Sequence, residues 1–456
     1  MTRARELVLT AACCLLTCNY ALAAVTADEA AALKTTLTPM GAEKAGNKEG
    51  SIPAWDGGVT KGPANYKQGD PRPDPFPGEQ PLFSVTAANM AQHESKLSEG
   101  VKAMLKKYPN TFRLDVYPTH RTAGAPQWVY DNTFKNATRA KVTAEGFVEG
   151  AYGGIPFPIP KSGAEAIWNH RLQFTGEGSS MAGMGVIGLP DGKVIQGVQG
   201  TDLHLRNYYA SKGTLESFDG GMDFARVWVM APAFQAGQQF TVHDFTNKPR
   251  QSWQYLTGQR RIRKAPSICC DAPDEINSGI NYWDESFVFQ GDLDRFDWEI
   301  VGKKELYIPY NNGKIFQPGL TLNQMGLSHH LNPDLVRWEL HRVWVVEAKL
   351  ASGKRHVIPK RRFYLDEDTW GAVLSDGYDS EGKLWRMGLA LPMLVPDGPY
   401  VVPNMAWGVY NILQGSYMMT QLPDYAFHKR FYKALTRQEI DPNRVMPDAM
   451  AGEASR

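Results

Sequence analysis

Three runs of residues between Arg337 and Leu391 constrain the fold more than any other part of this sequence. They read RWELHRVWVVEAKL, KRHVIPKRRFYLD and LWRMGLAL, and the turn sequences ASGK and DSEGK follow the first run and precede the third. Apolar and charged side chains alternate in the first run, which predicts a strand with one buried face and one face in water. A strand of about fourteen residues is roughly twice the usual length and suits a large curved sheet or partial barrel.

Helical patterns are confined to the first part of the chain. A capping box at 26–29 opens a short helix, residues 84–108 carry apolar side chains at helical spacing, and further helices are expected near 131–140 and after Ser162. Strand patterns dominate after Leu172. This order predicts an α+β fold, in which N-terminal helices pack on or plug a large curved antiparallel sheet, an incomplete β-barrel.

The first 23 residues have the features of a secretory signal peptide. Two arginines precede an apolar stretch at residues 7–16, and the ALA triplet at 21–23 supplies a cleavage site. We expect a mature periplasmic protein that begins at Ala24. The alternative is an outer-membrane lipoprotein lipidated at Cys18, because LLTC loosely resembles a lipobox.

The mature chain divides into three predicted parts. Residues 24–80 form an N-terminal helix and an extended Gly- and Pro-rich arm that lies on the body, with Ile52 and Trp55 as anchors. Residues 81–430 form a single half-barrel domain with helices, and residues 431–456 form a C-terminal tail.

Charge and cysteine content exclude several classes of protein. Removing the leader leaves equal numbers of basic and acidic residues, so nothing predicts a nucleic acid partner. The two remaining cysteines, Cys269 and Cys270, are neighbours and cannot form a long-range disulfide. They can form a vicinal disulfide, bridge to another molecule or stay reduced, and we expect no functional role for them.

A curved sheet can keep an apolar concave face only where helices or a ligand cover it. The stiff apolar segment 152–160 is a candidate lid or cavity rim, and the alternative is a loop that packs on the sheet. The chain also contains 12 Trp, 19 Tyr and 19 Phe, which suit a cavity lining. The candidate ligand-binding residues are Tyr152, Ile155, Phe157, Ile159, Trp168, Trp228, Trp253, Trp298, Trp338 and Trp344.

The dense basic cluster of the chain comprises Arg260, Arg261, Arg263 and Lys264. The three arginines are candidates for contact with a lipid carboxylate or phosphate, or with an acidic partner. The alternative is a solvated ladder of side chains on a half-exposed strand.

Several short motifs lack the context that their chemistry needs. Residues 183–188 fit G-x-G-x-x-G, but a turn into a strand follows, so we expect a Gly/Met loop at a cavity mouth instead of a nucleotide site. Residues 366–368 (DED) lie between strands without a D-x-D-x-D-G pattern, which predicts a solvated hairpin turn. The histidines have no metal-ligand spacing and no G-x-S-x-G elbow occurs, so no metal, cofactor or catalytic residue is predicted.

Six longer stretches resemble the signature blocks of the DUF1329 family of Gram-negative proteins, over about residues 25–425. They are LTPMGAEKAGNKEGSIPAWDGG, GGIPFPIPKSGAEAIWNH, TGQRRIRKAP, DRFDWEIVGKKELYIPYN, LNPDLVRWELHRVWVVEAKL and RRFYLDEDTWGAVLSDGYDSEGKLWR. The resemblance implies a fold of the LolA/LolB type, an incomplete antiparallel barrel closed by helices around a hydrophobic cavity. It also implies an outer-membrane partner and an RND-type exporter as neighbours, and it supplies no agreed ligand and no catalytic residues.

We therefore expect a periplasmic carrier that binds a hydrophobic, lipid or lipid-like ligand and passes it between envelope partners without chemistry, with transient membrane contact. One alternative is a periplasmic hydrolase, which requires Ser, His and carboxylate side chains, or two perturbed acids, at the base of the cavity. Another is a scaffold subunit, which requires a filled β core and an exposed patch for a partner.

Overall fold

The computed structural model describes residues 24–59, 61–62, 66–68 and 70–453. The predicted signal peptide and Cys18 lie outside the described residues. Within the described ranges, no helix is both long enough and apolar enough to cross a membrane.

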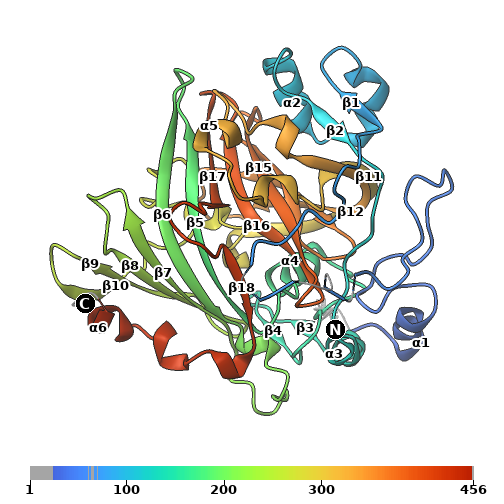
Figure 1. Cartoon of the computed structure of the whole chain (residues 1–456). Helices are drawn as coiled ribbons and strands as arrows, with labels where there is room; N and C mark the ends of the chain where they lie inside the picture. The colour runs from blue at the N-terminus through green and yellow to red at the C-terminus, as the bar shows by residue number, and fades with distance from the viewer. Residues whose placement is uncertain (1–23, 60, 63–65, 69, 454–456) are drawn as a thin grey trace, which may run out of the picture.

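One large curved sheet dominates the molecule (Figure 1). A separate small hairpin is formed by β3 (Lys141–Val142) and β4 (Val148–Glu149). The strands of the large sheet are β1 (Phe83–Val85), β2 (Leu114–Val116), β5 (Gly178–Gly188), β6 (Val194–Leu205), β7 (Gly221–Ala231), β8 (Gln239–Phe245), β9 (Gln251–Leu256), β10 (Arg261–Lys264), β11 (Phe296–Pro309), β12 (Arg337–Leu350), β13 (Lys360–Asp366), β14 (Ala372–Tyr378), β15 (Leu384–Val395), β16 (Tyr400–Asn411), β17 (Ser416–Pro423) and β18 (Tyr432–Leu435).

The main strand order is β11-β12-β13-β14-β15-β16-β17-β5-β6-β7-β8-β9-β10, and these neighbours are antiparallel. β18 pairs with β5, and β2 pairs with β1 and, in parallel, with β12. Among the described residues, no pairing joins the edge strands β10 and β11. The predicted incomplete barrel is therefore confirmed, with one parallel pair in an otherwise antiparallel sheet.

The predicted helices form with one correction. The helices are α1 (Ala27–Ala31), α2 (Glu99–Lys107), α3 (Gln127–Ala137), α4 (Gly163–Arg171), α5 (Leu322–Met325) and α6 (Ala449–Glu453). Thr26 and Glu29 form the capping box of α1, and Ser162 caps α4 by accepting a hydrogen bond from Glu165 N. The single helix expected over 84–108 is wrong, because the first residues pair as β1 and Ser98 starts α2 as a new N-cap.

The first of the three long runs forms β12, but both of its faces are buried. Glu339 and His341 lie on the face expected in water and are 0% and 1% exposed. Glu339 Oε1 accepts from Arg337 Nε at 2.5 Å, and Oε2 lies 3.1 Å from His341 Nε2. Ion pairing within this face lowers the cost of burying it. The second and third runs form β13 and part of β15. They are not neighbours in the sheet, because β14, a strand that was not predicted, lies between them.

The acidic turn that follows β13 is buried, which contradicts the predicted solvated turn. Arg121 donates to both oxygens of Asp368, with Nε–Oδ2 at 2.9 Å and Nη2–Oδ1 at 2.6 Å. Glu367 accepts from Arg342 Nη1 at 3.1 Å. Arg121 Nη2 also donates to the Glu43 carbonyl at 2.8 Å, so this buried ion network ties residues 38–55 of the arm to the sheet.

Further contacts hold the same arm on the body. Ile52 is 1% exposed, Trp55 Nε1 donates to the Ala123 carbonyl at 2.9 Å, and Trp370 Nε1 donates to the Met40 carbonyl at 2.7 Å. The arm therefore covers part of the sheet and is not a free linker.

Residues 183–188 belong to β5, so the predicted loop at a cavity mouth is wrong. A Cβ on Gly185 would lie 3.2 Å from the Cα of Gly197 on β6. Glycine therefore allows close approach of the two strands here and does not form a phosphate-binding turn.

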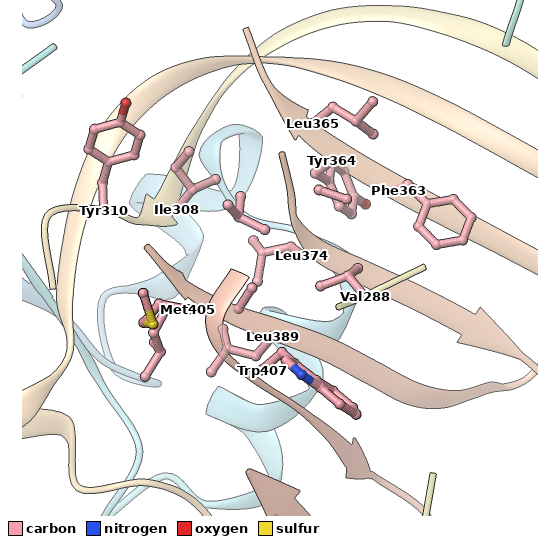
Figure 2. Close-up of a cluster of buried hydrophobic side chains, with 14 of the residues drawn as sticks. Val288, Ile308, Tyr310, Phe363, Tyr364, Leu365, Leu374, Leu389, Met405 and Trp407 are labelled. Carbon is pink, nitrogen blue, oxygen red and sulfur yellow. The ribbon is translucent and has the colours of Figure 1, made fainter. Parts of the chain in front are cut away.

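Side chains fill the half of the sheet that runs from β11 to β15. Figure 2 shows part of this core, including Ile308, Phe363, Leu374 and Leu389, all of which are 2% exposed or less. α4 packs on β11 and β12, and α2 packs on β14 and β15. This half is a conventional hydrophobic core.

A candidate ligand-binding interior

The segment between β10 and β11, residues 265–295, crosses the concave side of the sheet. Its Phe287 packs against Trp407 of β16 with ring centroids 5.5 Å apart, and its Phe289 packs against Phe363 of β13 at the same separation. Trp283 packs near β8 in a smaller apolar cluster. We call residues 265–295 the covering segment, because its side chains line part of both cavities on the concave side.

Two cavities, of about 110 Å³ and about 150 Å³, lie between the covering segment and the concave side of β5 to β8. Since they share part of their lining, they are neighbouring compartments of one interior. The shared residues are Met181, Asp202, His204, Phe287, Gln290 and Gln421.

The larger compartment exposes mainly apolar surface and is called the apolar compartment. Successive side chains of a strand point to opposite faces of the sheet, so every second side chain of β6, β7 and β8 points toward the apolar compartment. Its apolar lining includes Val198, Ala225, Val227, Val242, Ile276, Trp283 and Trp407.

The smaller compartment also exposes more apolar than polar surface, but charged side chains from β6 and β7 face it, and we call it the polar compartment for these groups. His204 Nδ1 lies 2.8 Å from Asp223 Oδ2. Gln421 Nε2 donates to Asp202 Oδ2 at 3.1 Å, and Arg206 Nη2 donates to the hydroxyl of Ser179 at 3.1 Å.

Five side chains of the polar compartment each have a buried polar atom without a hydrogen-bond partner among the described residues. Buried polar atoms in proteins are nearly always paired. A concentration of unpaired atoms around one cavity is therefore typical of a site that binds a polar group. The atoms are Asp202 Oδ1, Asp223 Oδ1, Gln173 Oε1, Arg206 Nη1 and Arg171 Nε.

Burial and charge pairing set the protonation of these groups. Burial alone would lower the pKa of His204, but the carboxylate of Asp223 raises that pKa above its ordinary value. Burial would raise the pKa of Asp223, but His204 more than offsets this effect and the pKa is lowered. Burial raises the pKa of Asp202. The compartment thus contains an ion pair beside a weaker acid.

Ser179, His204 and Asp223 line the same compartment, which is the combination that the hydrolase alternative requires. The histidine–carboxylate pair is in place. Ser179 Oγ instead accepts from Arg206, and the hydrogen bonds of the described residues include none between Ser179 and His204. The geometry therefore supplies a base and its carboxylate without an aligned nucleophile.

The ten residues predicted to bind a ligand lie elsewhere. Tyr152, Ile155, Phe157 and Trp168 are buried in the main core. The Tyr152 hydroxyl donates to the Ala210 carbonyl at 2.6 Å. Segment 152–160 therefore packs as a loop, and Ile159 is half-buried against α1 and its neighbours.

The remaining tryptophans of the ten do not line the interior either. Trp298 and Trp338 pack in the core, and Trp344 stacks on Trp370 at 5.9 Å. Trp253 contacts the ring of His243 at 5.0 Å, and Trp228 lines a different pocket beside Arg226. None of the ten lines either described compartment, so ligand binding by these residues stays a prediction.

The basic cluster lies at the sheet edge. Arg260 is in the turn before β10, Arg261 and Arg263 are on β10, and all three are exposed. Other arginines, Arg206 and Arg171, face the polar compartment. A head-group or partner contact for the exposed cluster stays a prediction.

Sequence reasoning missed the residues that line the interior. The signal was the run TDLHLR at 201–206, where Asp202, His204 and Arg206 occupy every second position of a strand. Charged residues at every second position of a strand usually indicate a face in contact with solvent. The pattern alone therefore does not distinguish a solvent-exposed face from one that lines a polar cavity.

Fold and interior together define a class of protein built on an open, curved sheet with two neighbouring cavities on its concave side. The model of the family described as a protein of unknown function, DUF1329, matches residues 84–450. The chain belongs to this family, as the sequence predicted.

One relative and two solved structures are similar to this chain. An uncharacterized protein from Pseudomonas aeruginosa is 40% identical over 414 residues, which cover 87% of this chain and 88% of the relative. A DUF1329 family protein from Desulfovibrio piger is 14% identical, with 60% of this chain and 92% of that chain covered and a TM-score of 0.38. A LolA superfamily protein from Nitrosomonas europaea is 9% identical, with 64% and 100% covered and a TM-score of 0.35.

Proposed function

We propose that this protein is a periplasmic carrier that binds one lipid or lipid-like amphiphile in its covered interior. The observation that supports this function is the contact between an apolar and a polar compartment that share six lining residues. An acyl chain in the apolar compartment would contact Val227, Val242 and Trp407. Each buried methylene stabilises the complex by roughly 0.8 kcal/mol, before ordering costs are subtracted.

The covering segment is the element that would move when ligand is loaded and released, because its residues line both compartments. Phe287 and Val288 in this segment have φ angles of 53° and 72°. This left-handed conformation is unfavourable for a β-branched residue such as Val288. A strained segment over the interior suits an element that opens when ligand is exchanged with an envelope partner. An outer-membrane protein and an RND-type exporter are the partners of this proposal.

Extraction of the native protein tests the proposal. We would purify the mature protein from the periplasm, extract it with organic solvent and analyse the extract by mass spectrometry. The carrier account predicts an amphiphile at up to one molecule per chain. A clean extract, together with no saturable binding of added lipids, would overturn it.

A hydrolase is the second candidate, because Ser179 shares the polar compartment with the His204–Asp223 pair. The carrier account predicts no turnover of a medium-chain ester such as 4-nitrophenyl laurate. Turnover by the wild-type protein that is lost in Ser179→Ala would favour the hydrolase. Ser180→Ala is the matched control, because Ser180 lines neither interior compartment.

A further inference from the structure

The unpaired atoms of the polar compartment include both acceptors and donors. Asp202 Oδ1, Asp223 Oδ1 and Gln173 Oε1 accept hydrogen bonds. Arg206 Nη1 and Arg171 Nε donate them. A group that only accepts would leave the carboxylate oxygens unpaired, and a group that only donates would leave the guanidinium atoms unpaired. Each unpaired buried group costs about 1–3 kcal/mol.

The charges around the compartment oppose an ion of either sign. An anionic head group would lie beside the carboxylates of Asp202 and Asp223. A cationic head group would lie beside Arg206, Arg171 and the histidine that Asp223 favours in its charged form. In an interior of low dielectric, repulsion of this kind is costly.

We propose that the polar compartment binds an uncharged, hydroxyl-bearing group, such as the glycerol end of a monoacylglycerol. A hydroxyl both donates and accepts, so a diol can donate to Asp202 Oδ1 and Asp223 Oδ1 and accept from Arg206 Nη1. The assignment rests on the proposed carrier function, and it adds the chemical class of the ligand's polar end.

Three probes with the same twelve-carbon tail test this assignment on the delipidated full-length mature protein. They are 1-monolauroylglycerol, laurate and dodecyltrimethylammonium, and isothermal titration calorimetry below their critical micelle concentrations gives each dissociation constant. Because a hydrogen bond to a charged group contributes about 1.5–3 kcal/mol, we expect the glycerol ester to bind at least about tenfold more tightly than either ion. Equal affinities, or tighter binding of an ion, would overturn the assignment.

A variant pair separates head-group recognition from a structural effect. Asp202→Leu removes the acceptor, so the preference for the glycerol ester over laurate should fall by about tenfold. Asp56→Leu is the control, because Asp56 is exposed on the arm, and its preference should equal that of the wild type. An unchanged preference in a folded Asp202→Leu protein would contradict the assignment. If the Asp202→Leu variant does not fold, the comparison of the three probes on the wild-type protein still tests the head-group assignment.

The outcomes also distinguish this assignment from the carrier function. If the probes bind saturably without the predicted preference, the head-group class is wrong and the carrier function stands. If none of the three binds and no amphiphile copurifies, both are overturned.

Discussion

His204 and Asp223 form an ion pair across the neighbouring strands β6 and β7, with Nδ1 of the histidine 2.8 Å from Oδ2 of the carboxylate. Their side chains are only 12% and 18% exposed, and they line the polar compartment. The concave side of this sheet is therefore not uniformly apolar. The proposed ligand accordingly has a polar end as well as an apolar tail.

The His204–Asp223 pair should make stability depend on pH. The raised pKa of His204 means that its charged form stabilises the fold below about pH 6.5 and that this contribution is lost as pH rises through the folded-state pKa. The lowered pKa of Asp223 adds stability that is lost only as pH falls below about 3.8.

We therefore expect His204→Asn to destabilise the protein by about 1.5–3 kcal/mol at pH 6 and by less at pH 9, as measured by urea unfolding. His428→Asn, at a half-buried position outside both compartments, is the control. The interpretation would be contradicted if the free energy of unfolding differed more between wild type and His204→Asn at pH 9 than at pH 6.

Breaking the buried ion network should release the arm. Arg121→Ala removes both hydrogen bonds to Asp368 and the one to the Glu43 carbonyl. It leaves a buried carboxylate without its partner, so we expect a loss of about 3–5 kcal/mol in the free energy of unfolding. Limited proteolysis should cut residues 38–55 earlier than in the wild type. Lys48→Ala, at an exposed arm position, should show neither effect, and an equally stable and resistant Arg121→Ala protein would refute the role of the network.

Filling the apolar compartment should reduce binding without unfolding the protein. Ala225→Phe points a ring into a space of about 150 Å³, so it should lower the affinity for a twelve-carbon amphiphile by at least about tenfold. Ala91→Phe, at an exposed position, is the control of equal size change. Circular dichroism verifies the fold of both variants. Unchanged affinity in a folded Ala225→Phe protein would place the ligand elsewhere.

The neighbouring cysteines should differ in reactivity when they are reduced. The thiols of Cys269 and Cys270 are in contact, and the interaction with Cys270 lowers the pKa of Cys269 below that of an ordinary thiol. Because the thiolate is the nucleophile, alkylation of Cys269 by iodoacetamide should reach half its maximal rate at a lower pH than that of an ordinary thiol. Cys270→Ala should move that midpoint to higher pH, as followed by mass spectrometry, and an unmoved midpoint would show that Cys270 does not activate its neighbour.

Local patterns predicted local structure well. The run at 337–350 forms β12 with the expected bounds, and Ser162 caps α4 as expected. Burial of the charged face of β12 and of the acidic turn was not predictable, because it depends on partners far along the chain. Arg121 and Asp368 are separated by 247 residues, and no periodicity links them.

The same limit applies to the interior. Alternation along β6 predicts that Asp202 and His204 share a face, but only the covering segment turns that face into a cavity. The abundant tryptophans were expected to line the cavity, whereas Trp298 and Trp338 pack in the filled half of the sheet. Trp407, one of the tryptophans that do line the interior, had no distinguishing local signal.

The most direct test of the account is a crystal structure of the delipidated protein with 1-monolauroylglycerol. The account predicts density for the tail beside Val227 and Trp407, and a glycerol hydroxyl within hydrogen-bond distance of Asp202 and Arg206. Ligand density outside the covered interior, or an interior that contains only water at saturating ligand, would contradict the central claim that this space is the binding site.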